Sequence, residues 1–218
     1  MCWNADISIN TFLFSCFALT FIYITNTYTK YKTHSFDHPL VYLFLGFVVS
    51  MQLIEYFVWK NLHNNRVNTL LSKLISANVM VQPFILMCMI ESSLIRYTIL
   101  GLYVLSVVLF RLYKVFLNPF VFRTSVYKGH LKWDWIELKG IEGVMQLIYL
   151  AFYLAALLLI QNPLITLFGL VSMFVTFFFY FKDGTFGSMW CWVINLFLLY
   201  FIVNILLIQP FLEYNGLC

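Results

Sequence analysis

The stretch that decides the fold is Pro39–Trp59, PLVYLFLGFVVSMQLIEYFVW, in which Glu55 is the only charged residue. About twenty apolar residues is the length that a helix needs to cross the hydrocarbon core of a bilayer. Further segments of this kind fill most of the chain, over about residues 7–25, 69–90, 97–117, 141–160, 164–181 and 187–209. The sequence therefore predicts an all-α integral membrane bundle of about seven transmembrane helices, which forms a single transmembrane domain over residues 1–218.

The composition agrees with a membrane protein. The 218 residues are 62% hydrophobic and only 10% charged, and the mean hydropathy is +0.87, whereas a soluble domain carries about 25% charged residues. A net charge of +4 on so few exposed residues indicates a topological bias rather than binding to nucleic acid. We therefore expect the lipid bilayer as a partner and no nucleic acid.

The basic residues are unevenly divided between the two sides of the predicted topology. With seven spans, the side of the amino terminus carries Lys60, Arg66, Lys73, Arg111, Lys114, Arg123, Lys128, Lys132, Lys139 and Lys182, and the other side carries Lys30, Lys32 and Arg96. An excess of Lys and Arg marks the cytoplasmic side, so we expect a cytoplasmic amino terminus. The flanks of the first span alone predict the reverse, because basic residues follow that span and none precedes it. Arg111 and Lys114, at the end of the fourth span, are expected to snorkel.

The tryptophans all fall on the same predicted side as this excess of basic residues. Because Trp is enriched at membrane–water interfaces, the sequence predicts an interfacial collar of Trp3, Trp59, Trp133, Trp135, Trp190 and Trp192. Residues 118–140, between the fourth and fifth spans, mix aromatic and basic residues, which is typical of a segment lying in the headgroup region. The alternative is a lid over a site that opens on this face.

Glu55 is the strongest candidate for a functional group, because ionisable residues inside a span are costly and often functional. It shares one helix face with Gln52 and Trp59, and the structural alternative is a hydrogen bond that joins helices. The same half of the bilayer is predicted to hold an intramembrane polar cluster of Gln52, Glu55, Glu142, Gln146 and Asn195. Candidates on the same face are Cys2, Asn4, His130 and Cys191.

Several site classes find no support in the sequence. The cysteines show no CxxC and no zinc-ribbon spacing, so we expect no metal site and no cofactor. The seventh span contains no lysine that could hold retinal, and the Asp-Arg-Tyr and Asn-Pro-x-x-Tyr signatures of common receptors are missing. Inside the third span, Pro83 is expected to kink the helix, with Gln82 satisfying the backbone group that the proline frees.

Four motifs together resemble those of a known set of proteins. They are Met1-Cys2-Trp3-Asn4 with Ser8, Gln52-Leu-Ile-Glu55-Tyr-Phe-Val-Trp59, Gly129-His130-Leu-Lys-Trp133 and Gly187-Ser-Met-Trp-Cys-Trp192. As a set they resemble an uncharacterised family of small multipass membrane proteins encoded by giant DNA viruses and some protists. The resemblance covers nearly the whole chain, and it implies that the four motifs belong together and that the membrane is that of a host cell or a virion. It brings no activity, cofactor or substrate.

The sequence favours a small proton- or cation-coupled transporter or channel-like protein over an enzyme. In this interpretation Glu55 is the coupled group, and Gln52, Glu142 and Asn195 line a pocket for a small solute or ion. One alternative is a membrane-embedded enzyme acting on lipid, with Glu55, His130 or Cys191 as acid, base or ligand. Another alternative is a structural or host-interaction protein of a viral membrane.

Overall fold

A computed structural model describes residues 4–116, 121–136 and 140–216 of the chain. Its long helices are α1 (Ala5–Tyr28), α2 (Pro39–Lys60), α3 (Asn65–Cys88), α4 (Ser93–Phe116), α5 (Gly140–Leu159), α6 (Pro163–Tyr180) and α7 (Phe186–Val203). Within the described residues, six helices are long and apolar enough to cross a membrane, and α5 adds a shorter apolar stretch, Gly143–Leu159. The prediction of an all-α membrane bundle is confirmed, and the protein is a multi-pass integral membrane protein.

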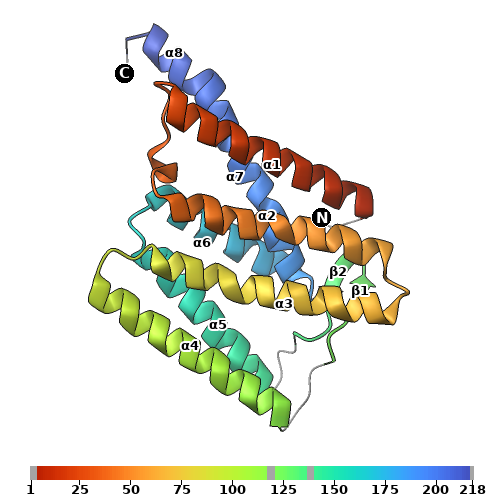
Figure 1. The fold of residues 1–218 in the computed structure, drawn as a ribbon. Coiled ribbons are helices and arrows are strands. Elements are labelled where there is room, and N and C mark those ends of the chain that lie inside the picture. The colour runs from red at the N-terminus through yellow and green to blue at the C-terminus, as the bar shows by residue number, and fades with distance from the viewer. Residues whose placement is uncertain (1–3, 117–120, 137–139, 217–218) are drawn as a thin grey trace.

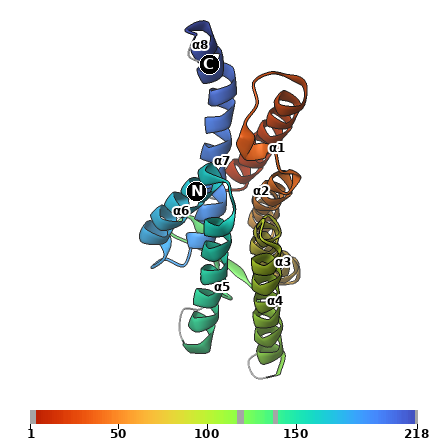
Figure 2. The ribbon, with the colours of Figure 1, turned by 90° about the vertical axis from the view of Figure 1, so that its left-hand side faces the viewer.

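The helices form two layers (Figures 1 and 2). α1, α2, α3 and α4 lie side by side in the order of the chain, and α5, α6 and α7 form a second layer behind them. In this second layer α7 packs against α1 and α2, whereas α5 packs against α3 and α4. α2 and α7 therefore lie at the centre of one half of the bundle, where the predicted polar residues are carried.

The helix starts follow the local sequence. Asn4 Oδ1 accepts from Ile7 N at 2.8 Å, and Asn64 and Asn162 cap α3 and α6 in the same way. Proline occupies the first turn of both α2 and α6, where its missing N–H costs no helical hydrogen bond. These caps satisfy backbone donors that would otherwise be left open at the membrane boundary.

Pro83 lies inside α3, and the backbone group that it frees is satisfied from another helix. A proline at this position cannot donate to the carbonyl of Val79, four residues earlier. The hydroxyl of Tyr149, on α5, donates to Val79 O at 3.0 Å, whereas the Gln82 side chain donates to Asn78. The expected role of Gln82 is therefore wrong, because an aromatic hydroxyl on the facing helix reaches the carbonyl instead.

The last helix is longer than predicted. α7 continues through a π-helical turn, η2 (Asn204–Ile208), into α8 (Gln209–Tyr214), so that the helical run passes the predicted end near residue 209. Pro210 explains the wider turn, because its ring would clash with the carbonyl four residues earlier in a regular α-helix. α8 projects beyond the ends of the neighbouring helices (Figure 1).

A β-hairpin lies between α4 and α5, and the sequence analysis did not predict it. Its strands β1 (Thr124–Tyr127) and β2 (His130–Trp133) are antiparallel, with Thr124 opposite Trp133. Lys128 and Gly129 form the turn with φ values of 49° and 78°, the left-handed conformation that a two-residue hairpin turn requires. The hairpin lies at the end of the bundle where α1, α3 and α7 begin (Figure 1).

The hairpin is attached to the helices by buried contacts. Asn68, on α3, donates to Thr124 O and accepts from Thr124 N, both at 2.9 Å. Leu131, Trp133 and Trp135 are 0%, 4% and 8% exposed. The expectation of a segment lying in the headgroup region is therefore wrong for these two tryptophans, because their rings pack inside the protein, where lipid headgroups do not reach.

Gly187, at the start of α7, makes the docking of the hairpin possible. A single methyl group added at this position should therefore lower the stability of the protein. A Cβ at this position would overlap the ring of Trp133. We expect Gly187→Ala to lower the free energy of unfolding by about 1–3 kcal/mol, as measured by thermal unfolding in detergent. Gly46→Ala is the matched control, since a Cβ at Gly46 meets nothing within 4 Å. If both variants were equally stable, the Trp133–Gly187 contact would not hold the hairpin.

Candidate functional site

The polar cluster is centred on α2, where Gln52 and Glu55 are both completely buried. They lie one turn apart and both face α7. Gln52 Nε2 donates to the carbonyl of Cys191 at 3.4 Å, and Glu55 is close enough to Cys191 to interact with it electrostatically. The predicted association of Gln52, Glu55 and Cys191 across two helices is therefore present in the structure.

α3 supplies two further polar side chains that the sequence analysis did not place in the cluster. Asn78 Nδ2 donates to Ser50 Oγ at 2.7 Å, and Gln82 Nε2 donates to Asn78 Oδ1 at 2.9 Å. The Gln82 side chain also lies near Cys191, since both residues line the same two cavities. Asn78 and Gln82 stand four residues apart in an apolar span, and this spacing is the sequence signal that could have identified them.

Two small cavities adjoin this cluster, and a third adjoins one of the two. We call the one of about 80 Å³ between α3, α5 and α7 the central cavity; Gln82, Gln146, Trp190 and Cys191 line it. The deep cavity, of about 40 Å³, shares Gln82, Trp190 and Cys191 with it. The hairpin cavity, of about 70 Å³ between α3, α4 and α5, shares Gln146 and Trp133 with the central cavity. The three cavities thus form a row that passes from the hairpin to the polar cluster.

The remaining predicted cluster members have different positions. Gln146 lines the central cavity across from Gln82. Asn195, on α7, faces α1 instead, where its Oδ1 accepts from Ser15 Oγ at 2.7 Å, so it joins two helices. Glu142 lies in the first turn of α5, and its side chain is outside the part of the chain that the structure describes.

The four same-face candidates separate in the structure. Cys191 belongs to the cluster, whereas Asn4 is exposed and caps α1. His130 lies on β2, and its ring packs edge-on against that of Tyr180 with centroids 5.6 Å apart. Cys2 lies outside the described residues. A pairing of His130 with Cys191 in nucleophilic catalysis finds no support, because His130 packs against α6 and not against the cluster.

The predicted tryptophan collar is divided between the cavities and the rim. Trp133 and Trp135 stack with centroids 5.6 Å apart and line the hairpin cavity, and Trp190 lines two cavities and donates to Ser172 Oγ at 3.0 Å. Trp59 and Trp192 are partly exposed, but the Nε1 of each indole ring is buried. Trp3 lies outside the described residues. Three of the expected lipid anchors are therefore walls of the cavities.

Two basic residues on α4 turn toward the protein, and sequence reasoning missed this. Lys114 is only 5% exposed, and Arg111 Nη2 donates to Ser76 Oγ at 3.5 Å. Ser76 also lines the hairpin cavity. The expected snorkelling finds no support in the structure, because Arg111 bonds to Ser76 of α3 and Lys114 is buried.

The size and the chemistry of the cavities limit what the site can accept. Each has room for a few water-sized molecules, since one water needs about 10–15 Å³ measured in this way, and each is small beside the ~300–1,000 Å³ of sites for drug-sized ligands. Their polar groups are amide, hydroxyl and thiol, whereas the buried carboxyl of Glu55 lines none of the three. No group of three His, Cys, Asp or Glu that could hold a metal ion occurs among the described residues.

A functional conclusion for this chain rests on the geometry of the site. No family model, no curated protein and no solved structure matches the chain. The resemblance to membrane proteins of giant viruses and protists stays a prediction.

His130 predicts a pH dependence of hairpin docking. Burial lowers the pKa of His130 below its ordinary value of 6.5, and nearby Asp183 only partly opposes this shift. The undocked hairpin therefore binds a proton more readily, so docking is strongest above pH 6.5 and weakens as the pH falls toward the lowered pKa. We expect hydrogen exchange in residues 124–133, corrected for its intrinsic pH dependence, to be faster at about pH 5 than at about pH 7.

The control for this measurement is His130→Gln, which cannot titrate. Its exchange should show no such change between the two pH values. An equal acceleration in the variant, or slower exchange of the native hairpin at low pH, would contradict the assignment.

Proposed function

We propose that the protein is a small proton- or cation-coupled carrier with a channel-like row of cavities. The observation that carries this proposal is the complete burial of Glu55 near Cys191, a residue that lines two of the cavities. A carboxyl at this depth in a membrane-spanning helix is costly to keep, and such groups are characteristic of ion and proton pathways.

The dimensions of the cavities support a small solute. Volumes of about 40, 70 and 80 Å³ suit a proton carried on water or a small cation rather than a metabolite or a lipid. The aromatic walls exclude bulk water, because Tyr149, Trp133 and Trp190 surround the central cavity. In this proposal amide oxygens of Gln82 and Gln146 replace part of the hydration shell of the ion.

Glu55 would couple transport to charge. Adding or removing a proton or cation at its carboxyl changes the charge beside Cys191 and Gln52, two residues that join α2 to α7. Only a ligand that binds two conformations with different affinity can shift the balance between them. A change of charge at the contact between two packed helices would provide that difference.

The hairpin would act as the gate at one end of the row. Trp133 lines both the central cavity and the hairpin cavity and is buried against Gly187. Movement of β2 away from α7 would open the cavities toward the side that carries most of the basic residues. We propose that this side is cytoplasmic, because Lys and Arg accumulate on the cytoplasmic side of membrane proteins.

The test compares the native protein with Glu55→Gln in proteoliposomes. Internal pH is followed with a pH-sensitive dye after a proton gradient is imposed, in sodium and in potassium buffers. We expect the variant to fold and to lose at least about nine-tenths of the flux, since an amide keeps most hydrogen bonds but cannot bind a proton. Glu55→Leu should also destabilise the bundle, by roughly 0.6–2 kcal/mol.

Glu213→Gln is the matched control, because it makes the same chemical change at an exposed carboxyl on α8. It should leave flux unchanged. A Glu55→Gln protein that is stable and transports as well as the native protein would remove Glu55 from the mechanism. The absence of gradient-driven flux in the native protein under every ionic condition would overturn the carrier proposal itself.

A further inference from the structure

A fourth cavity lies at the opposite end of the bundle from the hairpin, and we call it the distal cavity. Its volume is about 320 Å³, within the range of about 300–1,000 Å³ that is typical of small-molecule sites. Three connections meet there: the linker between α1 and α2, the turn between α3 and α4, and the turn between α5 and α6. It shares no lining residue with the three cavities of the proposed transport path.

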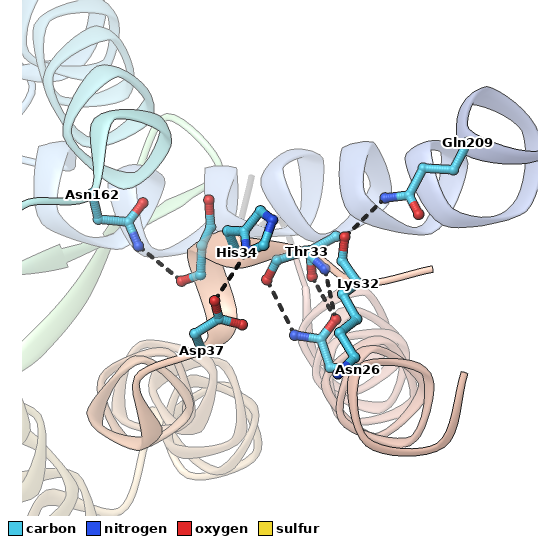
Figure 3. Close-up of polar contacts among 8 residues, drawn as sticks. Asn26, Lys32, Thr33, His34, Asp37, Asn162 and Gln209 are labelled. Carbon is cyan, nitrogen blue, oxygen red and sulfur yellow. Dashed lines mark hydrogen bonds and ion pairs between the residues drawn. The ribbon is translucent and has the colours of Figure 1, made fainter. Parts of the chain in front are cut away.

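The linker that forms one wall is fixed by several helices (Figure 3). Asn26, on α1, and the backbone of Thr33 exchange hydrogen bonds of 3.1 and 2.8 Å. Asn162, at the start of α6, donates to Ser35 O at 2.8 Å, and Gln209, on α8, donates to Lys32 O at 3.1 Å. The wall is therefore preorganised, which lowers the cost of ordering a ligand site.

Two of the lining residues, Arg96 and His38, can receive an anionic group. The Arg96 side chain is half-buried, and its Nη1 donates to Ile90 O at 3.1 Å, which leaves further N–H groups of the guanidinium for a ligand. His38 Nδ1 accepts from Leu40 N at 3.2 Å, so a neutral His38 carries its proton on Nε2 and donates there. A guanidinium beside a second donor suits a phosphate, which offers several acceptor oxygens.

The other polar lining residues can receive a cationic group. Asp37 and Glu91 come from two different connections, and both are exposed to the cavity. The carboxylate of Asp37 is ordered by His34, whose Nδ1 lies 3.1 Å from its Oδ2. A ligand with only negative charge would be repelled by these two carboxylates, and one with only positive charge would be repelled by Arg96.

We propose that the distal cavity binds a phosphate ester that carries a primary ammonium group, the chemistry of ethanolamine phosphate. The phosphate lies against Arg96 and His38, and the ammonium lies against Glu91 and Asp37. Two sources offer this chemistry: an ethanolamine phospholipid of the adjacent leaflet, and free phosphoethanolamine from the aqueous side. The position at the ends of the spanning helices is the level at which lipid headgroups lie.

The first arm of the test titrates phosphoethanolamine into the full chain in detergent, by calorimetry. Glycerol phosphate lacks the ammonium, ethanolamine lacks the phosphate, and glycine replaces the phosphate with a carboxylate. We expect binding of phosphoethanolamine to be at least about tenfold tighter than that of each of the three probes. Equal binding of glycine would overturn the assignment of the phosphate. If phosphoethanolamine did not bind in this arm and no lipid bound in the next arm, the site itself would be overturned.

The second arm uses nanodiscs of phosphatidylcholine with and without phosphatidylethanolamine, followed by mass spectrometry of the lipid retained. Selective retention of phosphatidylethanolamine identifies the lipid as the source, and binding in the first arm alone identifies the free ester. Either result supports the proposed chemistry. Retention without preference for the ethanolamine headgroup, with no binding in the first arm, would contradict it.

Variants connect the binding to the named residues. Glu91→Gln should weaken the binding of phosphoethanolamine by about tenfold and leave the binding of glycerol phosphate unchanged, because only the ammonium group loses its partner. Arg96→Lys keeps the positive charge but loses the planar, two-pronged guanidinium group, so the binding of both phosphate esters should weaken. Lys128→Gln, on the hairpin at the other end, is the control and should bind as the native protein does. Unchanged binding in both Glu91→Gln and Arg96→Lys would place the ligand elsewhere.

Discussion

Inside a membrane, the polar side chains of α2, α3 and α7 can find hydrogen-bonding partners only within the protein, and this constraint holds the centre of the protein together. Gln52 donates to the backbone of Cys191, and Gln82 lines two cavities together with Cys191, so three helices converge on one residue. Leaving such groups unpaired in hydrocarbon costs several kcal/mol each. The convergence therefore fixes how α2, α3 and α7 face one another, and it places the carboxyl of Glu55 near Cys191.

The cavities themselves follow from two local features of the chain. Pro83 leaves the carbonyl of Val79 without its helical donor, and the hydroxyl of Tyr149, on α5, donates to that carbonyl. This hydrogen bond fixes a large aromatic side chain in the wall of the central cavity. Gly187 lets the ring of Trp133 approach the start of α7. A row of small spaces bounded by rigid aromatic rings is the result, closed by the hairpin at one end and ending at the polar cluster.

The sequence was sufficient for the parts of the fold that depend on composition and length. Apolar segments of about twenty residues must be helices in a bilayer, and the polar spacing along α2 identified Gln52 and Glu55 as one buried face. It was not sufficient where partners are distant in the chain. From the sequence alone, Trp133 is interpreted as a lipid anchor, whereas the structure shows that it packs against Gly187. Neither residue has a local sequence pattern that predicts the contact with the other. The hairpin was missed because its strands are short and mix aromatic with basic residues. Periodicity alone does not distinguish the sequence pattern of such strands from that of an interfacial segment.

The central claim is that the polar cluster faces a water-accessible path through the row of cavities. Reaction of Cys191, kept as the only cysteine, with a small impermeant thiol reagent in sealed proteoliposomes tests it most directly. The account predicts slow labelling from the hairpin side of the membrane and clearly faster labelling when Trp133→Ala removes the ring that separates the cavities from that side. If Cys191 in both proteins reacted only after unfolding, the cluster would be a sealed contact between helices, and the account would be contradicted.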